Sequence, residues 1–118
     1  MNQPYPYYTD GSERRAAPRK VLRTSVEVSL DNGTALAARS VDISQSGMGF
    51  VCNVNLPARS ACAVSFSLKL NDRDFLIALR GTVAYTVLSA QQGGFMVGLK
   101  FDPVPDAVAA FIMRYMNS

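Results

Sequence analysis

The amino-acid sequence predicts a mainly β protein, an antiparallel barrel of five or six strands followed by one α-helix. Three observations favour this fold class. Short runs of alternating apolar and polar residues recur along the chain, and turn-forming residues separate most of these runs. The last dozen residues then change from a spacing of two to a helical spacing. Short strands joined by local hairpins are typical of an antiparallel barrel.

The first two predicted strands form a hairpin. Apolar and polar residues alternate from Ser25 to Leu30, and residues 34–43 follow as the return strand. Between them, Asp31-Asn32-Gly33 supplies the turn, because Asn-Gly tolerates the positive φ values that tight hairpins require.

The rest of the barrel comes from four further apolar or alternating runs. These runs are 48–51, 61–70, 75–88 and 95–101. Loops or turns are expected at 53–60, 71–74 and 91–94, where Gly, Pro, Asn and Asp gather. Gly81 interrupts the third run, which indicates a bend or a bulge there.

The two ends of the chain depart from this pattern. Residues 1–13 are rich in Pro and Tyr and have no period, so we expect a flexible N-terminal tail before a single domain at 14–118. Near the other end, Asp106 favours a helix start, and we expect a C-terminal α-helix at about 105–117. Its apolar stripe packs onto the barrel or, alternatively, binds a partner. The stripe consists of Val108, Phe111, Ile112, Tyr115 and Met116.

The composition limits the classes of function. The 118 residues carry a net charge of +3, no His and two Cys, so we expect no transition-metal site. Acid–base catalysis would depend on isolated carboxylates, so the sequence does not favour an enzyme. Neither a signal peptide nor an apolar stretch of membrane-spanning length is recognisable, so we expect a cytoplasmic protein with reduced cysteines and no membrane span.

A cluster of positive charge precedes the first strand. Five basic residues and no acidic one lie between Arg14 and Arg23, which favours a local anion site over a long phosphate track. Pro18 disfavours a helix here, so Arg15 and Arg19 are expected on a solvated loop, from which they approach a ligand from different sides. A guanidinium group can bind a phosphate with two hydrogen bonds, stack on a base, or bond O6 and N7 of guanine.

A second polar cluster, Asp42-Ile43-Ser44-Gln45-Ser46-Gly47, ends the return strand. Asp42 and Ser44 are two residues apart, so we expect their side chains to point at one ligand or one patch of water. The Asp42 carboxylate can accept hydrogen bonds from N1 and N2 of guanine, and Ser44 can bond a phosphate or a base. Gly47 permits a positive φ and a close approach of backbone. A purely structural turn is the alternative interpretation.

These two clusters together resemble the motifs of the PilZ domain family. The pattern RxxxR occurs at 15–19 and DxSxxG at 42–47, in this order around one hairpin, and the resemblance extends over about 14–101. It implies a six-stranded PilZ-type β-barrel, a stand-alone single-domain protein that binds the bacterial second messenger cyclic di-GMP and catalyses no reaction. It also implies an unidentified downstream protein, in the control of motility, pili, biofilm or exopolysaccharide.

The resemblance also implies roles for individual residues. The phosphates and the guanine edges or faces would be held by Arg15 and Arg19, and guanine would be contacted by the DxSxxG loop. The ligand-binding residues implied in this way are Arg14, Arg15, Arg19, Asp42, Ser44 and Gly47. Arg14, directly before the motif, implies two stacked cyclic di-GMP molecules per chain rather than one. Tyr85 lies where relatives often carry an aromatic that stacks on a base, although packing on the barrel explains this tyrosine equally well.

Two other functions stay open at this point. A ligand-independent protein-interaction module of the same fold would use the motif residues only to fix loops. A small barrel that binds single-stranded nucleic acid would carry aromatics along one sheet face and a wider positive charge. The sequence shows neither feature clearly, so we expect no DNA or RNA partner.

Overall fold

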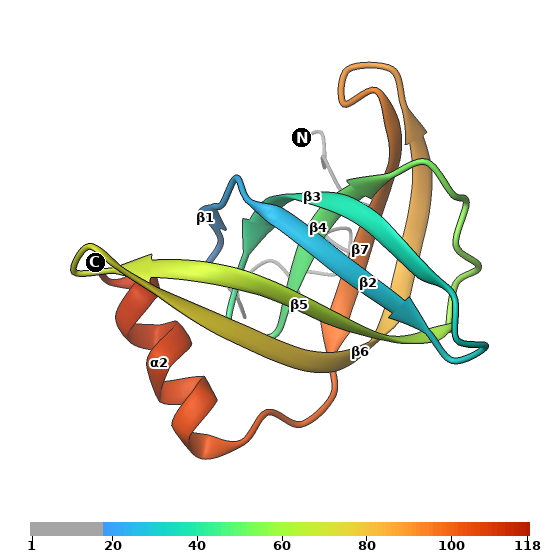
Figure 1. Ribbon diagram of the computed structural model, residues 1–118. Helices are drawn as coiled ribbons and strands as arrows, with labels where there is room; N and C mark the ends of the chain where they lie inside the picture. Colours follow the sequence, from blue (N-terminus) through green and yellow to red (C-terminus); the bar gives the residue numbers. More distant parts are fainter. Residues whose placement is uncertain (1–17) are drawn as a thin grey trace.

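The computed structural model describes residues 18–118, which form a β-barrel with one helix packed at its end (Figure 1). The strands are β1 (Lys20–Val21), β2 (Ser25–Leu30), β3 (Ala35–Ile43), β4 (Gly47–Cys52), β5 (Ala61–Leu70), β6 (Arg73–Ser89) and β7 (Gly94–Phe101), and the helix is α2 (Asp106–Met116). The expected tail at 1–13, together with Arg14 and Arg15, lies outside the described residues.

Six strands close the barrel. Hydrogen-bonded neighbours follow the order β3-β2-β5-β6-β7-β4, and a further pairing of β3 with β4 completes the ring. The strand pairs within residues 18–118 are antiparallel. The short β1 lies outside this ring and pairs with Asp42 and Ile43 at the end of β3. The predicted fold class, a mainly β six-stranded antiparallel barrel with a C-terminal helix, is confirmed.

The core occupies the interior of the barrel. Successive side chains of a strand point to opposite faces of the sheet, and on β2 the buried Val26 and Val28 alternate with exposed polar residues. The interior is filled by apolar side chains from all six strands of the ring, among them Ile43, Met48, Phe50, Val64, Phe66, Leu68, Val83 and Val97. Removing these side chains from water is the main favourable term in folding.

The hairpin turns use the residues that positive φ values require. Gly33 has φ 90° and Gly93 has φ 78°, as expected for the turns after β2 and β6. The β5–β6 turn is tighter than predicted, because it consists of only two residues, Asn71 and Asp72, with left-handed φ values of 55° and 63°. Strand β6 consequently begins at Arg73, two residues earlier than expected.

The register irregularity of β6 does not lie at Gly81, so a bulge at this glycine is wrong. The register shifts between Val83 and Tyr85, while Gly81 keeps its regular partners on β5 and β7. A Cβ atom at Gly81 would lie 2.6 Å from the carbonyl oxygen of Lys100. A glycine is needed here because β7 approaches closely, and the register shift lies further along β6, between Val83 and Tyr85.

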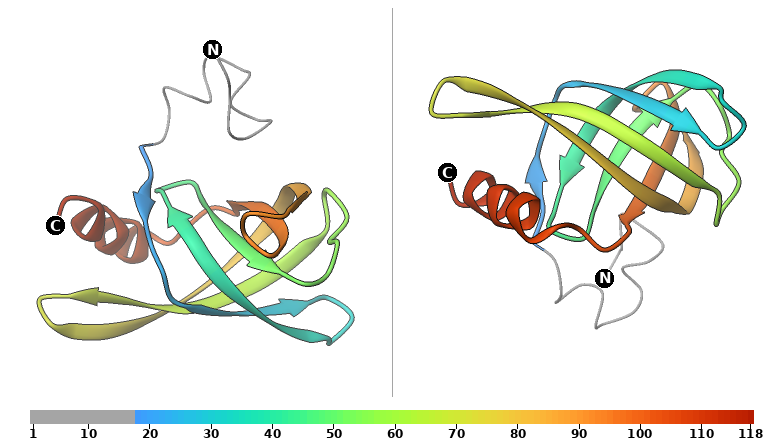
Figure 2. Two further views of the ribbon diagram at one scale, coloured as in Figure 1. Left: turned by 90° about the horizontal axis from the view of Figure 1, so that it is seen from above. Right: turned by 60° about the horizontal axis from the view of Figure 1, so that its bottom comes forward.

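Helix α2 packs beneath the projecting β5–β6 hairpin and beside β1 (Figures 1 and 2). Ile112 is fully buried and Tyr115 nearly so. The Phe111 ring lies 4.8 Å from the ring of Phe75 on β6, measured between centroids. The helix bounds agree with the expected 105–117, and the apolar stripe packs onto the barrel.

Two further observations concern the expected compartment. Cys52 and Cys62 are buried free thiols, and burial raises the pKa of the Cys62 thiol. In the part of the chain that the structure describes, no helix has the length and apolar character needed to cross a membrane.

Replacing Ile112 with Ala should lower the free energy of unfolding by about 2–5 kcal/mol, because the truncation leaves a cavity between α2 and the barrel. Urea denaturation measures this change. Met113→Ala is the control, since Met113 lies on the exposed side of the same helix and its truncation should change stability by less than about 0.5 kcal/mol. Equal small losses for both variants would contradict the packing described for α2.

Candidate functional site

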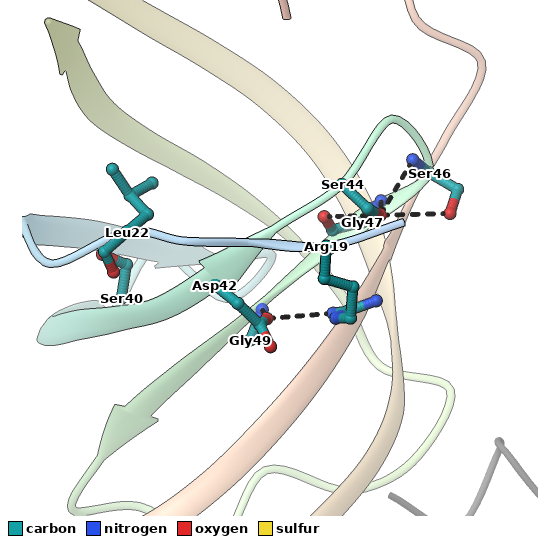
Figure 3. Close-up of polar contacts among 8 residues, drawn as sticks. All are labelled: Arg19, Leu22, Ser40, Asp42, Ser44, Ser46, Gly47 and Gly49. Atoms are coloured by element: carbon teal, nitrogen blue, oxygen red, sulfur yellow. Dashed lines mark hydrogen bonds and ion pairs between the residues drawn. The ribbon is translucent and has the colours of Figure 1, made fainter. Parts of the chain in front are cut away.

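The Ser40 hydroxyl positions the segment that carries Arg19. Between β1 and β2 the chain leaves the regular ladder, and Ser40 Oγ fills the gap by donating to the Leu22 carbonyl at 2.6 Å and accepting from the Thr24 amide at 2.9 Å. Ser40 is itself buried. The hydroxyl satisfies backbone groups that the kink would leave without partners, and it thereby keeps β1 beside the end of β3 (Figure 3).

This arrangement brings one residue of each sequence motif into contact. Arg19 Nη2 lies 3.1 Å from Asp42 Oδ1, and the same oxygen accepts a hydrogen bond from the Gly49 amide at 3.0 Å (Figure 3). The side chains of Arg19 and Asp42 are only 12% and 10% exposed. The expectation that Arg19 lies on a solvated loop is therefore wrong, because the pairing with Asp42 draws it against the barrel.

Ser44 belongs to a separate network inside its own loop. Its side chain is fully buried, and Oγ accepts from the amides of Ser46 and Gly47, each at 3.2 Å (Figure 3). The Ser44 amide donates to the Gly47 carbonyl at 2.8 Å. The expectation that Asp42 and Ser44 point at one ligand or one patch of water is wrong in this structure, since the Ser44 hydroxyl closes the loop on itself.

Gly47 is required for space rather than for an unusual φ. It is absent from the residues with positive φ among those described, so the positive φ expected for Gly47 is wrong. A Cβ atom at this position would collide with the Leu99 carbonyl oxygen of β7. Gly47 thus allows β4 and β7 to pair closely at the start of β4.

A row of cross-strand neighbours extends from Asp42 over the outside of the barrel. Asp42 on β3 pairs with Gly49, Gly49 pairs with Gly98 on β7, and Gly98 pairs with Tyr85 on β6. A Cβ at Gly49 would lie 2.9 Å from Asp42 Oδ1, and one at Gly98 would collide with the Tyr85 ring. The two glycines leave room for side chains of neighbouring strands, namely Asp42 and Met96 over Gly49 and the Tyr85 ring over Gly98.

Sequence reasoning assigned no role to Gly49 and Gly98. The signal that could have identified them is a single glycine inside an apolar strand, which often marks a close approach of another group.

Tyr85 packs outside the barrel core. The register shift between Val83 and Tyr85 moves the tyrosine to the opposite face from the buried Val83. There Tyr85 forms a small apolar cluster with Val51 and Met96 and is 8% exposed. The Tyr85 ring lies over Gly98 within this cluster. Its role in base stacking stays a proposal.

Two further arginines lie on β3 and on the segment between β1 and β2. Arg23 and Arg39 are exposed and line a hollow of about 290 Å³ together with Thr24, Ser25 and Ser40. Arg14 and Arg15 lie outside the described residues. Within 18–118, no three His, Cys, Asp or Glu side chains gather to hold a metal ion. The guanidinium groups described here can bind an anion, and the Asp42 carboxylate can accept hydrogen bonds.

Comparisons with known proteins agree with the fold. The sequence model described as the PilZ domain matches residues 13–118. Among solved structures, the Bacillus subtilis inhibitor of motility MotI/DgrA superposes with a TM-score of 0.77 at 13% identity, over 86% of this chain and 49% of its own. Escherichia coli YcgR in complex with c-di-GMP gives a TM-score of 0.73 at 15% identity, over 88% of this chain and 45% of its own. The PilZ domain of Escherichia coli YcgR with c-di-GMP gives a TM-score of 0.61 at 15% identity, over 86% of this chain and 87% of its own.

The family match covers most of the sequence, so the chain belongs to the PilZ domain family. At these low identities the likeness to the solved structures shows the fold alone. The chain spans about half the length of MotI/DgrA and of full-length YcgR. No curated protein matches it significantly.

Ser44→Ala should destabilise the protein by about 1–3 kcal/mol, because it leaves the buried Gly47 amide without its side-chain acceptor. Ser46→Ala is the matched control in the same loop, where Ser46 is exposed, and it should change stability by less than about 0.5 kcal/mol. Chemical denaturation of both variants without ligand measures the difference. A similar loss of unfolding free energy in both variants would contradict the structural role of the Ser44 hydroxyl.

Proposed function

We propose that this protein is a cyclic di-GMP receptor that acts by binding rather than by catalysis. The observation that carries the proposal is the contact between Arg19 and Asp42, since it joins the RxxxR and DxSxxG segments at one place on the outer face of the barrel. Membership of the PilZ domain family supports the same ligand.

The chemistry of the pair suits a guanine nucleotide. The N1–H and N2–H groups of guanine can donate hydrogen bonds to a carboxylate such as Asp42. The guanidinium group of Arg19 can donate hydrogen bonds to a phosphate or to O6 and N7 of guanine. Without ligand, the two charges satisfy each other at 3.1 Å. On binding, each exchanges this partner for a complementary group of the ligand, so neither charge becomes buried without a partner.

Related structures support this assignment. Their descriptions name c-di-GMP as the ligand of Escherichia coli YcgR, of MrkH from K. pneumonia and of PlzA from Borreliella burgdorferi. We extend that ligand to this chain, with Arg14, Arg15, Arg19, Asp42, Ser44 and Gly47 as the binding residues and Tyr85 as a stacking residue. Ser44 and Gly47 would act by holding the loop in shape.

The receptor would pass its signal to a downstream protein in the cytoplasm, in the control of motility, pili, biofilm or exopolysaccharide. A ligand-independent interaction module is the second candidate. One observation favours it, namely that Ser44 and the Arg19–Asp42 pair are satisfied by protein groups alone. Calorimetric titration with cyclic di-GMP separates the two, because a ligand-independent module gives no binding heat.

Asp42→Ala should weaken cyclic di-GMP binding by on the order of 1.5–3 kcal/mol and reduce the preference over cyclic di-AMP, because adenine lacks the N1 and N2 hydrogens that the carboxylate accepts. Competition between the two dinucleotides measures the preference. The control is Asp74→Ala, which removes an exposed carboxylate paired with Lys69 on the β5–β6 hairpin. An unchanged preference in Asp42→Ala would leave Asp42 as a structural residue.

The wild-type chain should bind two cyclic di-GMP molecules, since three arginines at 14, 15 and 19 can engage more phosphates than one ligand presents. Arg14→Leu should reduce the stoichiometry toward one in calorimetry. Arg23→Leu, which removes an exposed arginine outside the motif, should leave two. One ligand per wild-type chain at saturation would refute the two-ligand arrangement while leaving the choice of ligand intact.

A further inference from the structure

Two adjacent basic residues at β1 contact different parts of the molecule. Arg19 contacts Asp42. Lys20 instead donates from Nζ to the Tyr115 carbonyl at 3.1 Å, the Ser118 carbonyl at 3.1 Å and Ser118 Oγ at 3.0 Å. Neighbouring residues of a strand point to opposite faces, which explains how one short segment contacts both the proposed ligand site and the end of α2.

Lys20 acts as a side-chain cap of α2. The last carbonyl groups of a helix have no amide partner within the helix, and a positive charge there also interacts favourably with the helix dipole. The Tyr115 carbonyl also accepts from the Ser118 amide at 3.2 Å and from the Ser118 hydroxyl at 2.7 Å, so Lys20 adds a charged donor to a carbonyl that already has partners. The Lys20 ammonium group lies 4.6 Å from the centre of the Tyr115 ring. The other end of α2 has no side-chain cap, because its N-cap residue is Pro105.

The connection between the two contacts is short. Strand β1 has only two residues, with Lys20 opposite Ile43 and Val21 opposite Asp42. Arg19 and Lys20 share a peptide unit, so a shift of the Arg19 backbone also moves the Lys20 backbone. Contacts of 3.0–3.1 Å weaken steeply when one partner moves or tilts.

We propose that β1 couples the ligand site to α2, and that the bound ligand loosens the last turn of the helix. This inference rests on the proposed cyclic di-GMP function. The ligand draws Arg19 away from Asp42, the movement withdraws Lys20 from the carbonyls of Tyr115 and Ser118, and the end of α2 becomes the part of the receptor that reports occupancy to a partner.

Thermodynamic reciprocity gives this coupling a distinctive consequence. If ligand binding breaks the Lys20 contacts, then a protein that lacks those contacts binds the ligand more tightly by the same coupling factor. Simple electrostatics predicts the opposite, because removing a positive charge beside an anion site weakens anion binding. The sign of the change in affinity therefore distinguishes the two.

The test uses the full chain with Lys20→Met, which keeps the aliphatic stem and removes the charge. Lys100→Met is the matched control, because Lys100 is exposed and lies opposite Gly47 on another strand. Lys20→Arg retains the positive charge as a conservative variant. Calorimetry gives the affinity for cyclic di-GMP, and hydrogen exchange of residues 111–118 reports the last turn of α2 with and without ligand.

We expect Lys20→Met to bind cyclic di-GMP about fivefold or more tightly than the wild type, while Lys100→Met binds more weakly and Lys20→Arg resembles the wild type. Saturating ligand should speed exchange in 111–118 of the wild type, and Lys20→Met should exchange fast in both states. Weaker binding by Lys20→Met, or unchanged helix exchange in the liganded wild type, overturns the coupling alone. No binding to the wild type overturns the proposed function and the coupling with it.

Discussion

Strand β3 is hydrogen-bonded along both edges, and the geometry of the candidate site depends on this constraint. Its first half pairs with β2, and its second half lies between β4 and β1. The pairing with β4 closes the barrel and brings the Gly49 amide to Asp42, while the pairing with β1 brings Arg19 to the same carboxylate. A change in the register of β3 would separate all three groups at once, since a slip by one residue reverses the face of every side chain.

Much of the fold could be predicted from the sequence because strand alternation and Asn-Gly turns are local signals. The roles of individual site residues were harder to predict, because they depend on contacts between distant segments. Ser40 looks like any polar strand residue, yet it fixes the kink between β1 and β2. Gly47 is needed because of the Leu99 carbonyl, some fifty positions later. The two motifs predicted that Arg19 and Asp42 would face one ligand, but not that they would contact each other and be shielded by this pairing.

The pairing of Arg19 with Asp42 also bears on the stability of the protein. Clustered arginines repel one another, and a buried carboxylate without a partner is costly. Pairing Arg19 with Asp42 reduces both penalties. In the Ser44 loop, the amides of Ser46 and Gly47 likewise have a hydrogen-bond acceptor within the loop, the Ser44 hydroxyl. A ligand that binds here as proposed would have to compete with this ion pair.

The closed ring also affects how the molecule behaves in a crowded solution. A strand with unpaired amide and carbonyl groups can join the sheet of another molecule and start aggregation. Ring closure removes such edges from most of the barrel. The β5–β6 hairpin projects beyond the region where β2 pairs with β5, so its edges there are open. Lys69, Arg73 and Asp74 occupy this projection, and charged side chains at such edges oppose strand addition between molecules.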